Sequence, residues 1–276
     1  MSTSSTSILI LGESKVGKTH YGAQILKRLM KGDGQLRMDG AASNLEPFQA
    51  AMDCLDEGVA AGHTSSTTYV DSVWPITDAF GAKAELFWPD YGGEQVLAIA
   101  KHRTVPAAWR DRIRTTPAWL LFVRLQLTRT PDDVLNRPLN ALTSTADNHE
   151  VNLSDQARLI ELLQILLYVR GSMSNQLLQN PRLCVVLSCW DELNTLEKPA
   201  DILLQRLPMF ASFIASNWAD PIILGLSALG QSLSAEVKDI HYAQTGSDQF
   251  GYVVLPDGQQ STDLTLPIQS LLSAKS

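Results

Sequence analysis

Residues Gly12 to Thr19 have the spacing G-x-x-x-x-G-K-[ST] of a phosphate-binding loop. A polyphosphate needs many hydrogen-bond donors in a tight arc, and glycines let backbone N–H groups and a helix N-terminus point inward. Lys18 would bridge the β- and γ-phosphates as a catalytic group, and the Thr19 hydroxyl would bind Mg²⁺. The residues expected to contact the phosphates are Gly12, Glu13, Ser14, Lys15, Val16, Gly17, Lys18 and Thr19.

The residues on either side of this loop have the patterns that the motif requires. Ile8 to Leu11 form a short apolar run suited to a buried strand, and the loop follows at once. From Lys18 onward, apolar residues recur at helical spacing until about Lys31 to Gly34. Because strand, loop and helix follow in this order, a chance match on a solvated lysine-containing turn is the weaker interpretation.

A second motif, D-x-x-G, occupies Asp90 to Gly93 at the end of a predicted strand. In a switch nucleotidase the aspartate holds Mg²⁺ through water, and the N–H of the last glycine senses the γ-phosphate. Alone the motif is also typical of an ordinary turn after a strand. Its position after the phosphate loop favours the interpretation as a second switch, with Asp90 near the metal and Gly93 near the phosphate.

Residues near the ends of two later strands predict recognition of the base. Asp191 follows the apolar run from Leu183 to Leu187, and a carboxylate there can accept bonds from the N1–H and 2-amino groups of guanine. Adenine lacks both donors and would leave the carboxylate unpaired. Ser227 and Ala228 could bring a backbone N–H to the guanine O6. The alternative is that Asp191 caps the following loop or helix.

Composition excludes several classes of protein. The chain has 276 residues and a net charge of −7, with a pI near 5.2, which disfavours a nucleic-acid or anionic-membrane binder. Its three cysteines form no C-x-x-C pair and suggest reduced thiols. The sequence contains neither a signal-peptide pattern nor an apolar run of about 18 residues. We therefore expect a cytoplasmic protein that binds a nucleotide, with no nucleic-acid or membrane partner.

Buried apolar runs alternate with helical patterns along the chain, and this alternation predicts an α/β fold. We expect a three-layer P-loop NTPase (G-domain) with a mostly parallel sheet. A predicted hairpin from Tyr69 to Trp88 would add one antiparallel edge strand. Without a linker to divide them, residues 1–276 are expected to form a single domain. Residues 128–152 would be an insertion, and a C-terminal extension would start at about residue 231.

The ordered motifs resemble the translation-factor-related class of Ras-like GTPases. More narrowly, the chain is similar to a bacterial family of double-GTPase domains, found beside a paralogous GTPase in gene clusters attributed to conflict or antiphage systems. The resemblance covers about residues 7–268. It is carried by the segments GKTHYGAQIL, WPDYGGEQ, SCWDEL and GYVVLPDGQQSTDLTLPI.

The resemblance implies a first switch, in which a threonine hydroxyl completes the Mg²⁺ shell. Thr64 is our choice because it lies just before the predicted strand at Tyr69, with Thr67 and Thr68 as close alternatives. The resemblance also implies a protein partner, such as the paralogous GTPase or an effector.

Two parts of the sequence depart from the ordinary G-domain pattern. Where that pattern has Asn-Lys-x-Asp, this chain has Ser188-Cys189-Trp190-Asp191. The asparagine normally braces the loop and the lysine stem covers the base. Ser188 could supply part of the brace, and Trp190 could either cover the base or belong to the core. The glutamine that usually orients water is replaced by Glu94, followed by Gln95, so both are candidate catalytic residues.

A basic segment, Lys101 to Pro117, has two interpretations. It could be a solvated helix face, or a docking surface beside the second switch.

The sequence thus predicts a Mg²⁺-dependent protein that binds GTP, hydrolyses it to GDP and phosphate, and acts as a switch. A non-hydrolysing sensor whose nucleotide sets assembly is one alternative, motivated by Glu94. An ATPase or a small-molecule kinase with the same loop is another.

Overall fold

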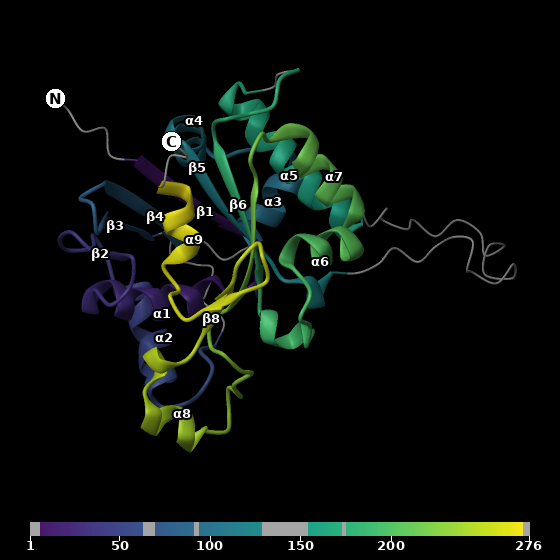
Figure 1. The fold of residues 1–276 in the computed structure, drawn as a ribbon. Coiled ribbons are helices and arrows are strands. Elements are labelled where there is room, and N and C mark those ends of the chain that lie inside the picture. Colours follow the sequence, from purple (N-terminus) through teal and green to yellow (C-terminus); the bar gives the residue numbers. More distant parts are fainter. Residues whose placement is uncertain (1–5, 63–69, 91–93, 129–153, 173–174, 273–276) are drawn as a thin grey trace, which may run out of the picture.

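The computed structural model describes residues 6–62, 70–90, 94–128, 154–172 and 175–272 (Figure 1). Within these residues a nine-stranded sheet has the order β2-β3-β4-β1-β5-β6-β7-β8-β9. The strands are β1 (Thr6–Gly12), β2 (Leu36–Met38), β3 (Val70–Asp78), β4 (Lys83–Asp90), β5 (Ala118–Val123), β6 (Arg182–Ser188), β7 (Ile222–Ser227), β8 (Tyr252–Val254) and β9 (Gln260–Ser261).

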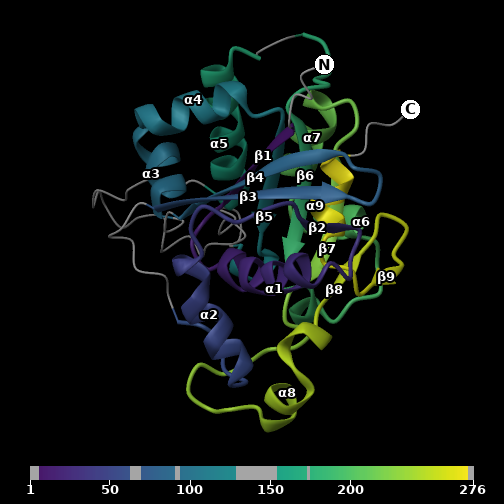
Figure 2. The same ribbon diagram turned by 90° about the vertical axis from the view of Figure 1, so that its left-hand side faces the viewer.

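Helices cover both faces of this sheet, as the two views show (Figures 1 and 2). The α-helices are α1 (Lys18–Lys31), α2 (Glu46–Asp56), α3 (Glu94–His102), α4 (Ala107–Thr115), α5 (Asp155–Arg170), α6 (Pro199–Arg206), α7 (Pro208–Asn217), α8 (Ile240–Thr245) and α9 (Leu266–Leu272). Short 3-10 turns are η1 (Leu125–Leu127), η4 (Trp190–Leu193) and η5 (Ser247–Gln249). In the described part of the chain, no helix has the length and hydrophobicity that crossing a membrane requires.

Alternating side chains of the central strands build two cores, one on each face of the sheet. In β1, Ile8 and Ile10 pack toward α1, α2 and α9, whereas Leu9 and Leu11 pack toward α3 to α7. β5 and β6 alternate in the same way. Because successive side chains of a strand point to opposite faces, a strand buried on both sides must be apolar throughout. This is why the runs around β1, β5 and β6 predicted a three-layer α/β fold.

The central strands β4, β1, β5, β6 and β7 are mutually parallel, and the α/β fold class is confirmed. The predicted hairpin is also confirmed, because β3 pairs antiparallel with β4. β3 is not the edge strand, however. The short β2 pairs outside it, and β8 and β9 extend the opposite edge in antiparallel fashion. These added strands have only two or three residues, too few for a period-2 pattern to predict them.

Local signals set several helix boundaries. The Ser154 hydroxyl accepts a bond from Ala157 N at 3.2 Å and caps α5, and Gly171 ends this helix in the left-handed conformation. The helical segment between Pro199 and Asn217 consists of two helices, α6 and α7. Pro208 divides them because it lacks an N–H and disfavours a helical conformation at Leu207, whose φ is −134°.

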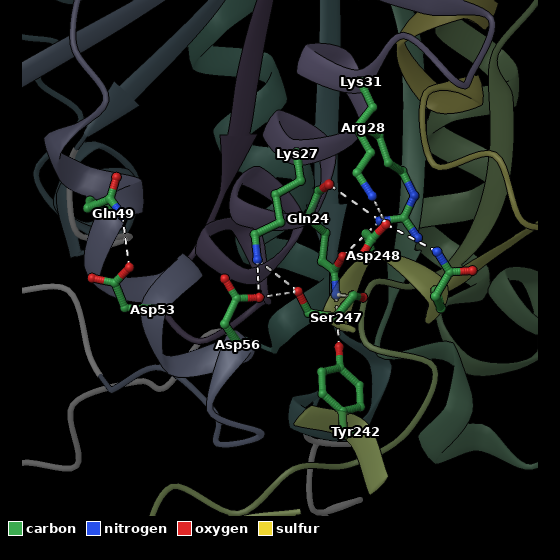
Figure 3. Close-up of polar contacts among 11 residues, drawn as sticks. Gln24, Lys27, Arg28, Lys31, Gln49, Asp53, Asp56, Tyr242, Ser247 and Asp248 are labelled. Atoms are coloured by element: carbon green, nitrogen blue, oxygen red, sulfur yellow. Dashed lines mark hydrogen bonds and ion pairs between the residues drawn. The ribbon is translucent and has the colours of Figure 1, made fainter. Parts of the chain in front are cut away.

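A polar network joins the outer face of α1 to the C-terminal segment, here residues 231–272 (Figure 3). Gln24 is fully buried and donates both to the Tyr242 hydroxyl at 2.8 Å and to Ser247 O at 2.9 Å. The guanidinium of Arg28 donates to Gln24 Oε1 at 2.8 Å and to Phe250 O at 2.5 Å. The network therefore fixes the helix that starts at the predicted phosphate loop against residues more than 200 positions later in the chain.

We expect Arg28→Met to lower the free energy of unfolding by about 2–4 kcal/mol, because it leaves Gln24 Oε1 and Phe250 O without a buried donor. Urea denaturation measures the loss. Lys31→Met is the matched control, because this substitution removes an exposed lysine that pairs with Asp248 on the same helix face. Its effect should be small. Equal effects of the two substitutions would show that the buried network does not stabilise the fold.

Candidate functional site

The predicted phosphate loop lies at the carboxyl edge of the parallel strands, between β1 and α1. Its backbone is tightly turned. Lys15 has a φ of 64° and Gly17 has a φ of 82°, both in the left-handed region. At Gly12 a Cβ would come within 3.0 Å of Phe122 Cβ and Val16 Cγ2, so glycine is required for close packing. The loop therefore has the curled form that an anion-binding backbone needs.

Lys18 lies in the first turn of α1 and turns back over the loop. Its Nζ donates to Gly12 O at 2.8 Å and to Glu13 O at 2.5 Å. Burial of the ammonium lowers the pKa of Lys18 to about 7, an effect that the nearby Glu13 carboxylate opposes. The direct partners of this cation are carbonyl oxygens, so an anion placed beside it would favour its charged form.

Two arginines that the sequence analysis did not single out hold the loop from outside. Arg158 of α5 forms a bidentate pair with Glu13, at 2.6 Å for Nε–Oε1 and 2.9 Å for Nη2–Oε2. Arg124, just after β5, donates from Nη1 to Lys15 O at 3.0 Å. Its other nitrogens pair with both carboxylate oxygens of Glu192. No local motif marks either arginine, because their partners lie 68 to 145 positions away.

The residues predicted to bind metal are placed only in part. Leu9 of β1 is opposite Phe87 of the parallel β4. Gly12 and Asp90 each lie three residues further along, so β1 and β4 end at the same edge. Thr19 is in the first turn of α1, which starts at this edge. The backbone thus brings Asp90 and Thr19 to one end of the sheet.

Several other predicted residues lie outside the described residues. These are the first-switch candidates Thr64, Thr67 and Thr68, together with Gly93 of the second switch. Glu94 and Gln95, the candidates for orienting water, are the first two residues of α3. The assignments of metal and water ligands therefore stay predictions.

On the predicted base side, Asp191 lies just after β6 and Ser227 is the last residue of the adjacent parallel strand β7, and their side chains are in contact. The Ser227 hydroxyl donates to Asp191 Oδ1 at 2.5 Å and accepts a bond from Gly230 N at 3.0 Å. This fixes the carboxylate in the wall of a pocket of about 210 Å³. The pocket is lined by Gly17, His20, Ala60, Arg124, Ser188, Cys189, Asp191, Glu192, Leu226, Ala228, Leu229, Gln231, Ser232 and Leu233.

The departures in Ser188-Cys189-Trp190 have defined places. Trp190 belongs to the core, since only 2% of it is exposed and its ring leaves no room for a Cβ at Gly225. The Ser188 hydroxyl lies 3.3 Å from Val123 O of the neighbouring strand, where it donates a hydrogen bond within the sheet. Cys189 has a left-handed φ of 53° and lies beside Gly17. Burial raises the pKa of its thiol to about 12, so the thiolate is disfavoured.

His20 connects the first turn of α1 to the chain that leaves α2. Its Nε2 accepts a bond from Ala61 N at 3.0 Å, which requires a neutral imidazole with the proton on Nδ1. Burial and the nearby Arg124 cation lower its pKa, which favours that neutral form. This agrees with a packing role for His20.

The basic segment around α4 contacts the body of the protein. Arg103 pairs with Glu161 of α5, and Arg114 donates to Val169 O at the end of that helix. Arg112 lies over the Phe87 ring at 5.0 Å from its centroid. These contacts favour the interpretation as a partly solvated helix face over a docking surface.

A match to a known family covers both the phosphate loop and the Asp191–Ser227 pair. A family model described as Double-GTPase 1 matches residues 9–271. The chain belongs to the Double-GTPase 1 family. The narrow resemblance predicted from the ordered motifs is therefore confirmed, and membership of this family supports GTP binding. No curated protein sequence matches the chain.

Solved structures give more distant likenesses. A bacterial selenocysteine-specific elongation factor, EF-Sec, is 14% identical with a TM-score of 0.37, covering 81% of this chain and 26% of that chain. A chain in the structure of the signal recognition particle receptor SRb-GTP/SRX complex from Chaetomium thermophilum is 15% identical with a TM-score of 0.42. The match covers 85% of this chain and 95% of that chain. The chain thus spans about a quarter of the length of the elongation factor.

The lowered pKa of Lys18 predicts that GDP binds with net proton uptake. At pH 8.5 the side chain of Lys18 in the ligand-free protein is mostly neutral. The phosphates of GDP are already ionised at this pH and would favour the charged form of Lys18. Affinity should therefore fall as the pH rises above about 7. Titration calorimetry in EDTA, in buffers of different ionisation enthalpy, measures the uptake without a contribution from metal.

Lys15→Met is the matched control, because this lysine of the same loop is exposed and the substitution should leave the uptake unchanged. In the absence of ligand, the lowered pKa of Lys18 makes the free energy of unfolding rise as the pH is raised from about 7 to the ordinary lysine pKa. Over this range the unfolded state binds more protons than the folded state. Binding of GDP with no proton uptake would contradict this role of Lys18.

Proposed function

We propose that this protein binds GTP with Mg²⁺, hydrolyses it to GDP and phosphate, and acts as a nucleotide-dependent switch. The observation that carries the proposal is one continuous pocket wall. Gly17 of the phosphate loop and the Ser227-bonded Asp191 line the same pocket. A guanine nucleotide would place its phosphates at Gly12 to Thr19 and its base edge at Asp191, with Ala228 on the O6 side.

The chain's own residues would bind the triphosphate chiefly by position and charge. The loop amides and the N-terminus of α1 would surround the phosphates. The Lys18 ammonium, now on Gly12 O and Glu13 O, would reach the β- and γ-phosphates. Thr19 and Asp90 would hold Mg²⁺, with Thr64 as a third ligand, and the ion would neutralise charge on the terminal phosphates.

Glu94 or Gln95 would orient the attacking water from the start of α3, while the Gly93 N–H would contact the γ-phosphate. Loss of that phosphate would release the two switch segments, and a protein partner, such as a second GTPase or an effector, would detect the change. A place in a bacterial antiphage system, which the family resemblance implies, and a cytoplasmic location, which the sequence composition favours, remain part of the proposal.

Asp191 provides the sharpest test of base recognition. The wild-type protein should bind GDP and GTP at least about tenfold more tightly than ADP and ATP, because adenine leaves the Asp191 carboxylate without a donor. Asp191→Asn should remove that preference. It should also improve binding of xanthosine diphosphate, whose 2-carbonyl accepts a bond from the new amide. Calorimetric titration with the four guanine and adenine nucleotides and the xanthine analogue measures these ratios.

Glu192→Gln changes the neighbouring carboxylate and serves as the control for charge at this loop. It should leave xanthine binding weak. If ATP binds as tightly as GTP, and Asp191→Asn changes nothing, the GTPase assignment fails and the ATPase or kinase alternative takes its place.

Hydrolysis has its own test, single-turnover conversion of GTP with a saturating excess of protein. Only one of the two substitutions, Glu94→Gln or Gln95→Ala, should remove the water-orienting residue. That substitution should slow conversion about 100-fold with little change in GTP affinity, and the remaining one should have a small effect. A wild-type protein that binds GTP tightly but does not convert it, alone or with added partner, would favour the non-hydrolysing sensor.

A further inference from the structure

Arg124 lies between the two parts of the site that would hold opposite ends of a nucleotide. Its Nη1 donates to Lys15 O of the phosphate loop at 3.0 Å, and its Nε donates to Glu192 Oε2 at 3.0 Å. Its Nη2 donates to the other Glu192 oxygen. Glu192 is the residue next to Asp191, and both belong to residues 189–194, here called the base-side loop. One guanidinium therefore connects the phosphate loop directly to the base-side loop.

Ser188 and Cys189 do not supply this connection in the way that the asparagine and lysine of the ordinary Asn-Lys-x-Asp pattern would. The Ser188 hydroxyl bonds Val123 O inside the sheet. Cys189 presents a sulfur atom to the loop, 3.6 Å from where a Cβ at Gly17 would lie, rather than a charged or amide group. The direct polar link that an asparagine would make is thus replaced by a longer one, which starts from the end of β5.

The chemistry of the link suits a brace. Arginine presents a planar fork that matches a carboxylate with two parallel bonds while a third N–H points elsewhere. The hydrogen bond to Glu192 raises the pKa of Arg124, so its charge is retained over the whole working pH range. Both side chains are about one quarter exposed, at 27% and 24%. Gln126 adds a bond to Glu192 O at 2.9 Å, which holds the same loop from a neighbouring residue.

We propose that Arg124 is a positioning residue that fixes the base-side loop relative to the phosphate loop through Glu192. The proposal rests on the proposed function, because it takes Asp191 as the group that contacts the base. A ligand that reaches both loops, such as GDP, would find them already held at the spacing that it needs. A ligand that reaches the phosphate loop alone, such as pyrophosphate, would gain little from the brace.

The experiment compares GDP and pyrophosphate binding by calorimetry for wild type, Arg124→Met, Glu192→Met and the double variant, in one Mg²⁺ buffer. Arg124→Met should weaken GDP binding about tenfold and pyrophosphate binding less than about threefold. The double variant should bind GDP no more weakly than the worse single variant, because the two side chains act through one contact. Arg124→Lys, which keeps the charge but cannot make two parallel bonds to the carboxylate, serves if a methionine variant does not fold.

Arg158→Met is the matched control. It removes the arginine that anchors the other side of the phosphate loop through Glu13, but it leaves the connection to the base-side loop intact. It should weaken GDP and pyrophosphate by the same factor. If Arg124→Met also weakens both ligands equally, or if the losses in the double variant multiply, Arg124 is ordinary loop support and the proposal is wrong.

A second measurement separates this proposal from the proposed function. Pyrophosphate should slow backbone hydrogen exchange at residues 189–194 in wild type, because the brace transmits order from one loop to the other, and should not do so in Arg124→Met. A wild-type protein without guanine preference would overturn the base assignment of Asp191. The exchange result would still decide whether Arg124 couples the two loops. Equal protection by pyrophosphate in wild type and in Arg124→Met would refute this coupling.

Discussion

A backbone that curls around an anion cannot stabilise itself, and the rest of the site depends on how this loop is held. Its N–H groups must stay available for an anion, so its carbonyls need partners from outside the loop backbone. Lys18 takes Gly12 O and Glu13 O, and Arg124 takes Lys15 O. Three carbonyls are thus satisfied by two cations, and the left-handed φ of Lys15 is retained by contacts from other elements.

Charge is distributed unevenly around this loop in a protein whose net charge is −7. Arg158 is neutralised by Glu13 and Asp155, and Arg124 by Glu192. Lys18 instead contacts carbonyl oxygens, and its ammonium is costly to keep charged until an anion arrives. The proposed binding of an anion at this point therefore depends on one poorly compensated lysine rather than on a broadly basic surface, which agrees with the acidic composition.

Sequence patterns predicted the parts whose signals are local. The loop spacing and the apolar runs of β1 and β6 each act within a few residues, and they lie where they were expected. Arg124 and Arg158 were not predicted, because their partners are distant in sequence and single arginines have no period. Trp190 stayed ambiguous because an aromatic residue after a strand suits either a ligand or a core, and only packing against Gly225 decides between them. The roles of Thr64, Gly93 and Glu94 stay predictions.

The network on the outer face of α1 also has a consequence for the order in which the chain is made. Tyr21 donates its hydroxyl to Leu264 O at 2.9 Å, and Gln24 bonds Tyr242 and Ser247. The groups that satisfy the polar side chains of this helix are synthesised more than 200 residues after it. During translation α1 therefore stays incompletely packed, and the loop at its start gains its full support only after residues 242–264 have been synthesised.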